Sequence, residues 1–279
     1  MPTIAEKRVT FHKLHAAGCF VLPNPWDIGS ARYLQGLGFE ALASTSAGFA
    51  FTQGLPDGGV SRAMMLAHFR ELVAATDVPV NADFENGYAD APEGVAESVR
   101  LCIDTGVAGL SIEDSTSDPA IPLYDFDLAL ARVRAARAAV DKAGGDVVFT
   151  ARSEGFVRGR PDLDETVRRL KAFAEAGADC LYAPGIKTPE QIAAVVKAVA
   201  PKPVNFLMAT ATDLTLATLA ELGVRRVSLG GTLARVAWTA ATRAARDIAE
   251  AGSFKSLAGT MANAELNAFF AEDTKKRKR

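Results

Sequence analysis

The chain has 279 residues, of which 49% are hydrophobic and 23% are charged, so it is long enough and apolar enough for a large folded core. Its formal net charge of -2 gives no general case for nucleic acid or an anionic membrane as a partner. We find no apolar stretch that would span a bilayer and no secretory signal at the N-terminus. Cys19, Cys102 and Cys180 lack metal-type spacing, so we expect buried thiols in a cytoplasmic protein.

Eight short apolar runs recur along the chain, and a segment with helical periodicity follows most of them. Runs that are apolar throughout are typical of strands buried on both faces of a parallel sheet. The eight predicted strands are Cys19–Pro23, Glu40–Ser46, Val78–Asp83, Gly109–Asp114, Val147–Arg152, Cys180–Pro184, Pro203–Met208 and Arg226–Gly230.

The intervening segments predict helices, for example at Leu128–Val140, Leu163–Ala176 and Pro189–Val199. Eight alternations of strand and helix predict an α/β fold, a single (β/α)8 TIM barrel over residues 1–251. A doubly wound sheet is the alternative, but we find no G-x-G-x-x-G loop near the start. Residues 252–279 predict a C-terminal helical extension and tail. We expect a short helix at Ala264–Phe270 and a disordered, solvated basic tail at Lys275–Arg279.

Acidic residues stand at the ends of two consecutive predicted strands. Asp83 and Glu85 project together, because alternate residues of a strand point to one face, and Glu113 ends the next strand. Repulsion and desolvation both penalise such a group of carboxylates, and a divalent cation would remove both costs. Oxygen ligands suit Mg²⁺, with Mn²⁺ as a substitute. Each acid alone also fits a solvated loop residue, but the matched positions of all three favour a metal site.

Other strand ends carry residues suited to an anionic ligand. The planar fork of Arg152 binds carboxylates, although a salt bridge to a neighbouring acid is a competing interpretation. The Ser46–Gly48 turn can offer backbone N–H groups to an anion, but it also fits an ordinary turn. Trp26 is placed to stack over a planar substrate or simply to pack. Asp57, in Leu55-Pro-Asp-Gly-Gly, fits a β-turn equally well.

The remaining polar candidates are fewer. Tyr182 and Asn205 follow the sixth and seventh predicted strands and belong to the same rim. His12, His15 and His68 fall in helical segments away from strand ends, and we interpret them as surface or packing residues. We find no Ser-His-Asp arrangement.

Five motifs follow one another at the predicted strand ends. They are Pro23-Asn-Pro-Trp-Asp27, Thr45-Ser-Ala-Gly48, Asn81-Ala-Asp-Phe-Glu-Asn-Gly-Tyr88, Gly109-Leu-Ser-Ile-Glu-Asp114 and Ala151-Arg-Ser-Glu154. Together they resemble the isocitrate lyase and phosphoenolpyruvate mutase superfamily, from about Phe11 to about Ala251. The resemblance implies a TIM-barrel enzyme that binds Mg²⁺ and a small 2-oxo or 2-hydroxy carboxylic acid. It also implies C–C or P–C bond chemistry next to the carbonyl through an enolate, and a homotetramer with exchanged helices after the eighth strand.

The resemblance also implies roles for single residues. It assigns Asp83 to direct contact with the metal, and Glu85 and Glu113 to the metal-bound waters. It assigns Arg152 to the substrate carboxylate. The remaining assignments are an anion-binding turn at Ser46, Ala47 and Gly48, a pocket wall at Trp26 and a site acid at Asp57. Mg²⁺ would stabilise the developing enolate oxygen, while N–H groups fix the anionic end.

The loop after the fourth predicted strand departs from the family. The C–C lyases carry Lys-Lys-Cys-Gly-His there, with the cysteine as acid/base, whereas this chain has Ser115–Tyr124 without cysteine, lysine or histidine. The lysine and asparagine gating loop of the mutases is missing too, and Gly185 replaces a glutamate of the lyases. The candidate proton donors are Ser115, Tyr124 and Tyr182.

We therefore expect a lyase or decarboxylase that acts on an oxaloacetate-type substrate. Decarboxylation fits best, because loss of CO₂ requires no base to start it. The alternatives are a phosphonomutase or phosphonopyruvate hydrolase, and a non-catalytic homologue that binds oxo acids.

Overall fold

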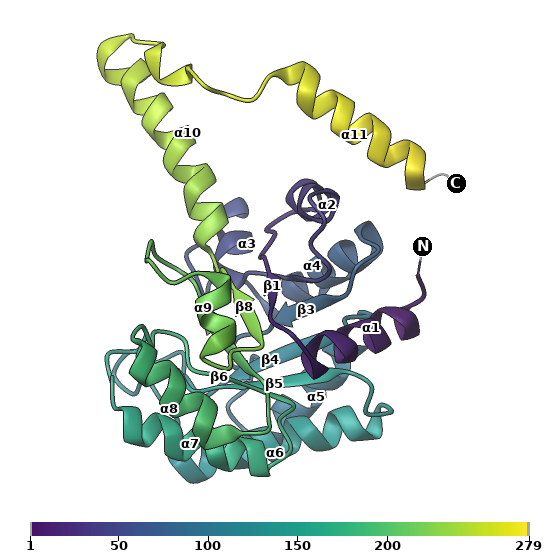
Figure 1. Ribbon diagram of the computed structural model, residues 1–279, viewed down its shortest axis with the longest axis vertical. Helices are drawn as coiled ribbons and strands as arrows, with labels where there is room; N and C mark the ends of the chain where they lie inside the picture. The colour runs from purple at the N-terminus through teal and green to yellow at the C-terminus, as the bar shows by residue number, and fades with distance from the viewer. Residues whose placement is uncertain (1, 278–279) are drawn as a thin grey trace.

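Eight parallel strands form a nearly closed barrel in the computed structural model, which describes residues 2–277 (Figure 1). The strands are β1 (Phe20–Leu22), β2 (Leu42–Ala43), β3 (Val80–Asp83), β4 (Gly109–Glu113), β5 (Val148–Arg152), β6 (Cys180–Tyr182), β7 (Val204–Leu207) and β8 (Arg226–Ser228). They pair in the order β1-β8-β7-β6-β5-β4-β3-β2, and a 3.0 Å bond from Ala43 N to Pro23 O links the two remaining edges. The predicted barrel and its eight strands are confirmed.

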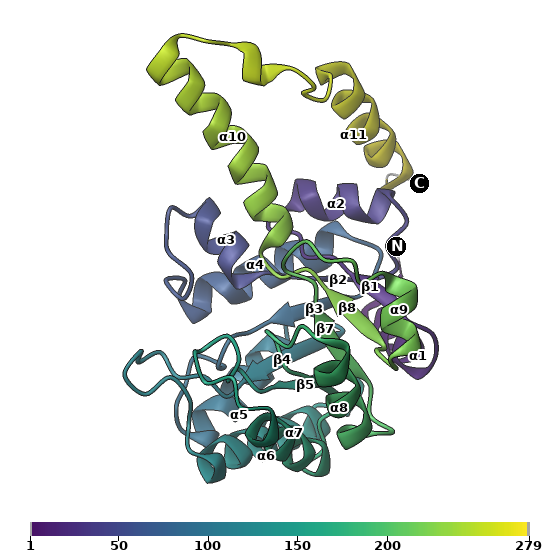
Figure 2. The same cartoon turned by 60° about the vertical axis from the view of Figure 1, so that its left-hand side comes forward.

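Helices alternate with the strands and cover the outside of the barrel (Figure 2). They are α2 (Ile28–Gly36), α3 (Ser46–Thr52), α4 (Arg62–Ala75), α5 (Pro92–Ile103), α6 (Phe126–Lys142), α7 (Leu163–Glu175), α8 (Pro189–Val199) and α9 (Leu216–Glu221). The three helices predicted from periodicity correspond to α6, α7 and α8. Among residues 2–277, no helix combines the length and the apolar character needed to cross a membrane.

A separate apolar cluster closes the amino ends of the strands. Helix α1 (Ile4–Ala16) lies across this end and contributes Phe11, which is fully buried. The cluster consists of Phe11, Phe20, Leu22, Ala41, Ala43, Ala108 and Val148. Gly109 allows this approach, because a Cβ at that position would lie 2.5 Å from Cε1 of Phe11. Polar residues gather at the opposite, carboxyl ends of the strands.

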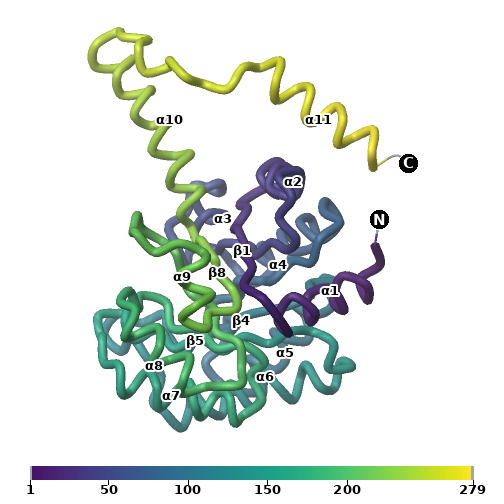
Figure 3. Tube along the Cα trace, in the orientation of Figure 1, coloured from purple at the N-terminus to yellow at the C-terminus, as the bar shows by residue number. Residues whose placement is uncertain are grey.

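The chain after the barrel forms an arm that leaves the barrel and returns. It comprises α10 (Thr232–Ala251), the short 3-10 helix η1 (Lys255–Leu257) and α11 (Asn263–Arg277). Figures 1 and 3 show α10 projecting away from the strands, while α11 comes back towards α2. The ring of Phe269 lies 4.6 Å from that of Tyr33, and a Cβ at Gly36 would meet Phe269 at 2.5 Å. Aromatic packing therefore docks α11 on α2.

The prediction of a disordered basic tail is wrong for Lys275–Arg277, which continue α11. Ion pairs between residues four positions apart extend the helix, with Lys276 Nζ 2.8 Å from Glu272 and Arg277 Nε 3.2 Å from Asp273. Arg277 also lies 3.7 Å from Asp77 on the barrel. The last two residues of the predicted tail lie outside the described residues.

Candidate active site

A cavity of about 1030 Å³ opens at the carboxyl ends of the strands. Most of the predicted site residues line it, although they come from six separate strand ends and loops. They are Ser46, Ala47, Asp57, Asp83, Glu85, Glu113, Arg152, Tyr182 and Asn205. Trp26 and Gly48 are not part of the lining. Instead they pack together, because a Cβ at Gly48 would lie 3.1 Å from Cβ of Trp26 and 3.2 Å from Cβ of Ala234.

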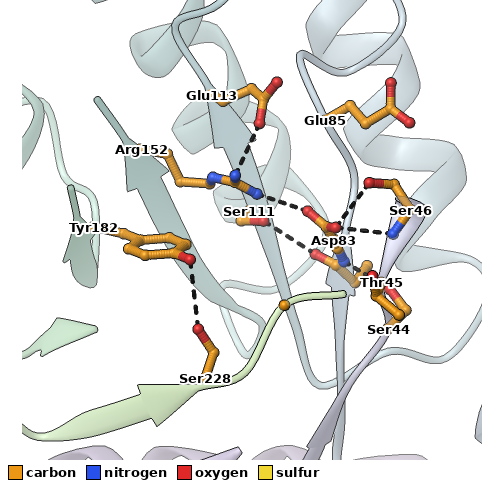
Figure 4. Close-up of polar contacts among 12 residues, drawn as sticks. Ser44, Thr45, Ser46, Asp83, Glu85, Ser111, Glu113, Arg152, Tyr182 and Ser228 are labelled. Carbon is orange, nitrogen blue, oxygen red and sulfur yellow. Dashed lines mark hydrogen bonds and ion pairs between the residues drawn. The ribbon is translucent and has the colours of Figure 1, made fainter. Parts of the chain in front are cut away.

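Arg152 sits at the centre of a cluster of carboxylates (Figure 4). Its Nη1 lies 2.7 Å from Asp83 Oδ1, its Nη2 lies 3.1 Å from Glu113 Oε2, and its Nε lies 2.8 Å from Glu154 Oε1. Burial works against the charge, but Glu154, Glu113 and Asp83 outweigh it and hold the pKa of Arg152 well above its ordinary value. Arg152 therefore forms the salt bridge that was the alternative to its binding a substrate carboxylate.

The second oxygen of Asp83 holds the start of α3. Asp83 Oδ2 accepts hydrogen bonds from Ser46 N at 2.9 Å and from Ser46 Oγ at 3.0 Å. The Thr45 side chain caps the helix by accepting from Gly48 N at 3.1 Å. Two N–H groups of the predicted anion-binding turn thus already have partners. Within the described chain, the Ala47 N–H is the member of this turn without a hydrogen bond.

The segment after β3 holds Glu85 in a strained backbone. Glu85 and Tyr88 have positive φ angles of 48° and 56°, and Tyr88 Oη donates to Glu85 Oε1 at 3.1 Å. Burial, followed by the nearby charges of Asp83 and Glu113, raises the pKa of Glu85 to about 7. Burial and the same two acids also raise the pKa of Asp57. Negative charge is therefore crowded on this side of the cavity.

This crowding fits a hard cation. Among residues 2–277, no three His, Cys, Asp or Glu side chains converge as a ready-made set of direct ligands. Mg²⁺ does not require such a set, because it usually takes one or two carboxylates and keeps several waters. Asp83, Glu85 and Glu113 offer oxygen atoms only, and a cation would offset both the burial and the repulsion that raise the pKa of Glu85. The donor chemistry is therefore compatible with Mg²⁺ or Mn²⁺.

The deeper part of the cavity is built from β6, β7 and β8. The Tyr182 ring lies 4.9 Å from Cζ of Arg152, and burial raises the pKa of Tyr182 to about 12. Ser228 Oγ donates to Tyr182 Oη at 3.5 Å (Figure 4). Asn205 accepts from Arg226 Nε at 2.8 Å and donates to Ser228 at 2.9 Å. Both ends of the Asn205 amide are thus already hydrogen-bonded.

Two loops form the mouth of the cavity. In the loop after β4, Ser115 Oγ donates to Glu113 Oε1 at 2.5 Å, and Tyr124 Oη donates to Asp90 Oδ1. The loop after β5 supplies Arg158, whose Nη2 lies 3.1 Å from Ser115 Oγ and 3.3 Å from Glu113 Oε1. Arg158 is not among the residues predicted from the sequence. A charged residue in the loop after a strand that ends in a candidate site residue is the signal that would have found it.

The histidines and cysteines lie outside this site, as predicted. The rings of His15 and Phe11 are 4.5 Å apart, and His68 stacks on Phe49 at 3.9 Å. The three cysteines are free thiols. The prediction of a buried thiol is confirmed for Cys102 and Cys180, whereas Cys19 is only partly buried.

Comparison with known proteins now gives the family. The phosphoenolpyruvate phosphomutase family model matches residues 11–249. The chain belongs to this family, within the isocitrate lyase and PEP mutase superfamily.

Individual relatives agree with this assignment. An oxaloacetate decarboxylase of Paraburkholderia xenovorans is 33% identical over 237 residues, covering 81% of this chain and 75% of the relative. An uncharacterized protein of Mycobacterium tuberculosis is 34% identical over 244 residues, covering 87% and 90%. The crystal structure of a putative lyase/mutase from Burkholderia cenocepacia superposes with a TM-score of 0.92 at 46% identity, covering 96% of each chain. Other matches include 2-methylisocitrate lyases and a putative phosphonomutase. The chain is thus related to lyases and mutases.

Proposed function

We propose that this protein is a Mg²⁺-dependent enzyme that breaks the C–C bond next to the carbonyl of a short 2-oxo acid. We favour decarboxylation of an oxaloacetate-type substrate. The observation that carries the proposal is the pairing of Asp83 and Glu113 with Arg152, in a cavity at the strand ends that Glu85 also lines. The similarity to an oxaloacetate decarboxylase supports the same substrate class.

The carboxylates at the ends of β3 and β4 would hold the cation. We assign Asp83 to direct contact, and Glu85 and Glu113 to the waters of the cation. Once bound, the cation supplies positive charge that polarises the oxo group of the substrate. Asp57, whose pKa is raised by burial and then by Asp83 and Glu113, would be the site acid at the edge of this group.

Arg152 would hold the carboxylate next to the oxo group. Its Nη1 and Nη2 now contact Asp83 and Glu113, the same acids that we assign to the cation. Because carboxylates near a cation attract a guanidinium less strongly, these N–H groups can turn to a substrate carboxylate. A further substrate contact would come from the Ala47 N–H, whereas Ser46 and Asn205, whose polar atoms already have partners, would shape the substrate pocket. Trp26 would pack against Gly48 and so hold the turn in place.

Tyr182 is the proton donor that the geometry favours. In decarboxylation the bond to CO₂ breaks, its electron pair stays on the enolate of the product, and the enolate carbon takes up a proton. With a pKa of about 12, Tyr182 keeps its hydroxyl proton at neutral pH, and it accepts rather than donates in its bond with Ser228. The hydroxyls of Ser115 and Tyr124 are weaker candidates, because each already donates to a carboxylate.

Turnover assays test this proposal. With Mg²⁺, the protein should convert oxaloacetate to pyruvate and CO₂ above the rate of the uncatalysed reaction, and excess EDTA should remove the difference. Tyr182→Phe should lower kcat more than it raises KM. Absence of product from oxaloacetate and other 2-oxo acids, together with a thermal shift on binding them, would instead indicate a binding protein.

The rival function within the family acts on a P–C bond. The similarity to a putative phosphonomutase supports this alternative. Release of phosphate from phosphonopyruvate, or its conversion to phosphoenolpyruvate, distinguishes the rival from decarboxylation in the same panel.

The arm after β8 supports a proposal about assembly. The side chains of Val236, Trp238 and Ile248 are exposed on α10, which projects from the barrel (Figure 1). We propose a homo-oligomer in the cytoplasm, a tetramer made of two dimers in which the two subunits of each dimer exchange these helices. Light scattering of the purified protein tests the state, and a monomer at micromolar concentration would contradict it.

A further inference from the structure

Three arginines line the cavity, and they differ in how many of their nitrogen atoms already have partners. All three nitrogens of Arg152 contact carboxylates. Those of Arg226 face Asn205, His15, Asn81 and Thr150 in the deeper part of the cavity. Both guanidinium groups are therefore built into the protein interior.

Arg158 is different. Its side chain is 43% exposed, and only its Nη2 has partners, Glu113 and Ser115. Within residues 2–277, its Nε and Nη1 make no hydrogen bond. The 3.3 Å contact to Glu113 is also longer than the contacts of Arg152 to its three carboxylates. Arg158 thus presents two N–H-bearing atoms of a fixed fork at the mouth of the site.

The position of Arg158 suits an anionic group at the far end of a short ligand. Arg152 contacts Oε2 of Glu113, whereas Arg158 contacts Oε1 of the same carboxylate. The two guanidinium groups therefore lie on either side of a single side chain, one deep in the cavity and one at its mouth. A short ligand with an anionic group at each end would therefore meet one of these guanidinium groups at each end.

We propose that Arg158 determines specificity by binding the distal anionic group, a carboxylate or a phosphonate, of a dianionic acid. This proposal rests on the proposed function, because it assumes that Arg152 and the cation hold the other end. It replaces the Ser46–Gly48 turn as the partner of the distal group, since the Ser46 and Gly48 N–H groups are already hydrogen-bonded. The cavity should therefore bind dianionic acids more tightly than monoanionic acids of equal length.

A matched pair of stable ligands tests the proposal by calorimetry in the presence of Mg²⁺. Malate and 2-hydroxybutanoate have the same chain length, and only malate carries a distal carboxylate. Arg158→Gln should weaken malate binding about tenfold or more, while the affinity for 2-hydroxybutanoate stays within about twofold. Arg158→Lys should recover part of the loss. The control is Arg160→Gln, which removes an exposed arginine of the same loop that does not line this cavity.

The outcomes separate this proposal from the one on which it rests. Wild-type protein that binds neither ligand overturns the proposed function and the role of Arg158 with it. Wild-type binding of both ligands with equal loss in Arg158→Gln, or with no loss, overturns the role of Arg158 alone. A parallel titration with 2-hydroxy-3-phosphonopropanoate shows whether the distal group is a carboxylate or a phosphonate, since the matching ligand binds more tightly and loses more affinity.

Discussion

The two ends of the barrel are lined by different kinds of side chain. At the carboxyl ends, charged groups such as Asp83 and Arg152 lie together and are held by ion pairs. At the amino ends, Phe11 and Phe20 pack in an apolar cluster beneath α1. The carboxyl ends surround an open cavity, so only there can a ligand reach and rearrange the charged groups. Binding and turnover should therefore depend on the carboxyl ends, and stability on the amino ends.

The largest expected effect is at the carboxyl ends. Asp83→Ala should abolish Mg²⁺-dependent binding of oxo acids and lower kcat/KM at least about a hundredfold, because the direct metal contact is lost. The fold should persist, since Arg152 keeps Glu113 and Glu154 as partners. Asp127→Ala, at an exposed position in α6 outside the cavity, is the control. Equal oxo-acid affinity with and without EDTA would refute the metal hypothesis.

Phe11→Ala is the corresponding change at the amino ends. Removing this fully buried ring should lower the free energy of unfolding by about 3–5 kcal/mol. Urea titration measures the loss, and kcat per folded molecule should stay near the wild-type value. Phe254→Ala, at an exposed side chain of the arm, should leave the barrel unaffected. A selective loss of turnover in Phe11→Ala would show that the amino ends also contribute to turnover, against the expectation above.

Arg152→Ala sharpens the comparison within the charged end. An arginine–carboxylate pair whose partner stays buried is worth about 2–5 kcal/mol, so kcat/KM for every 2-oxo acid should fall at least about tenfold. Arg152→Lys should recover only part of this, because a point charge cannot reproduce the planar fork. Wild-type kinetics in Arg152→Ala would mean that its contacts with Asp83 and Glu113 are purely structural.

The sequence was sufficient to predict the barrel because most strands are short, largely apolar runs followed by polar residues. Most of the residues predicted for the site line the cavity, since strand ends of a parallel barrel meet at one rim. Asp83, Glu113 and Tyr182 come from three different strands, and their convergence follows from topology alone.

What the sequence could not predict depends on loop paths and long-range pairing. Arg158 reaches Ser115 across 43 residues, so neither loop reveals the contact by itself. From the sequence, Arg152 could bind a substrate carboxylate or pair with a neighbouring acid. The structure shows that it pairs with three acids. Trp26 follows a strand end as expected, yet its side chain packs against α3 instead of lining the cavity.

A smaller effect is expected from pH at the amino ends. Burial, then the charge of Arg226, lowers the pKa of His15 to about 3. His15 Nδ1 lies 2.7 Å from Phe11 O, and Nε2 faces Arg226 Nη1 at 3.3 Å, so the neutral ring fits this place. Its contribution is complete above the unfolded pKa of about 6.5 and is lost as pH falls, by at most about 1.4 kcal/mol per pH unit.

Urea titrations at pH 7.5 and pH 5 measure this dependence. His15→Gln should reduce the difference in unfolding free energy between the two pH values, whereas His12→Gln, at an exposed position, should leave it unchanged. An identical difference in wild type and His15→Gln would place the pH dependence elsewhere.

The smallest effect concerns the cysteines, which lie away from both the charged cluster and the mouth of the cavity. Cys102 and Cys180 are fully buried and burial raises the pKa of each thiol, so both stay protonated and unreactive at neutral pH. Replacing Cys19, Cys102 and Cys180 together by Ala should cost about 1 kcal/mol of stability per buried residue, and turnover should remain largely intact. Activity and urea unfolding of the triple variant check both parts. If one replacement inactivated a protein that stays folded, a thiol would have to act in the reaction, and the assignment of proton transfer to Tyr182 would fail.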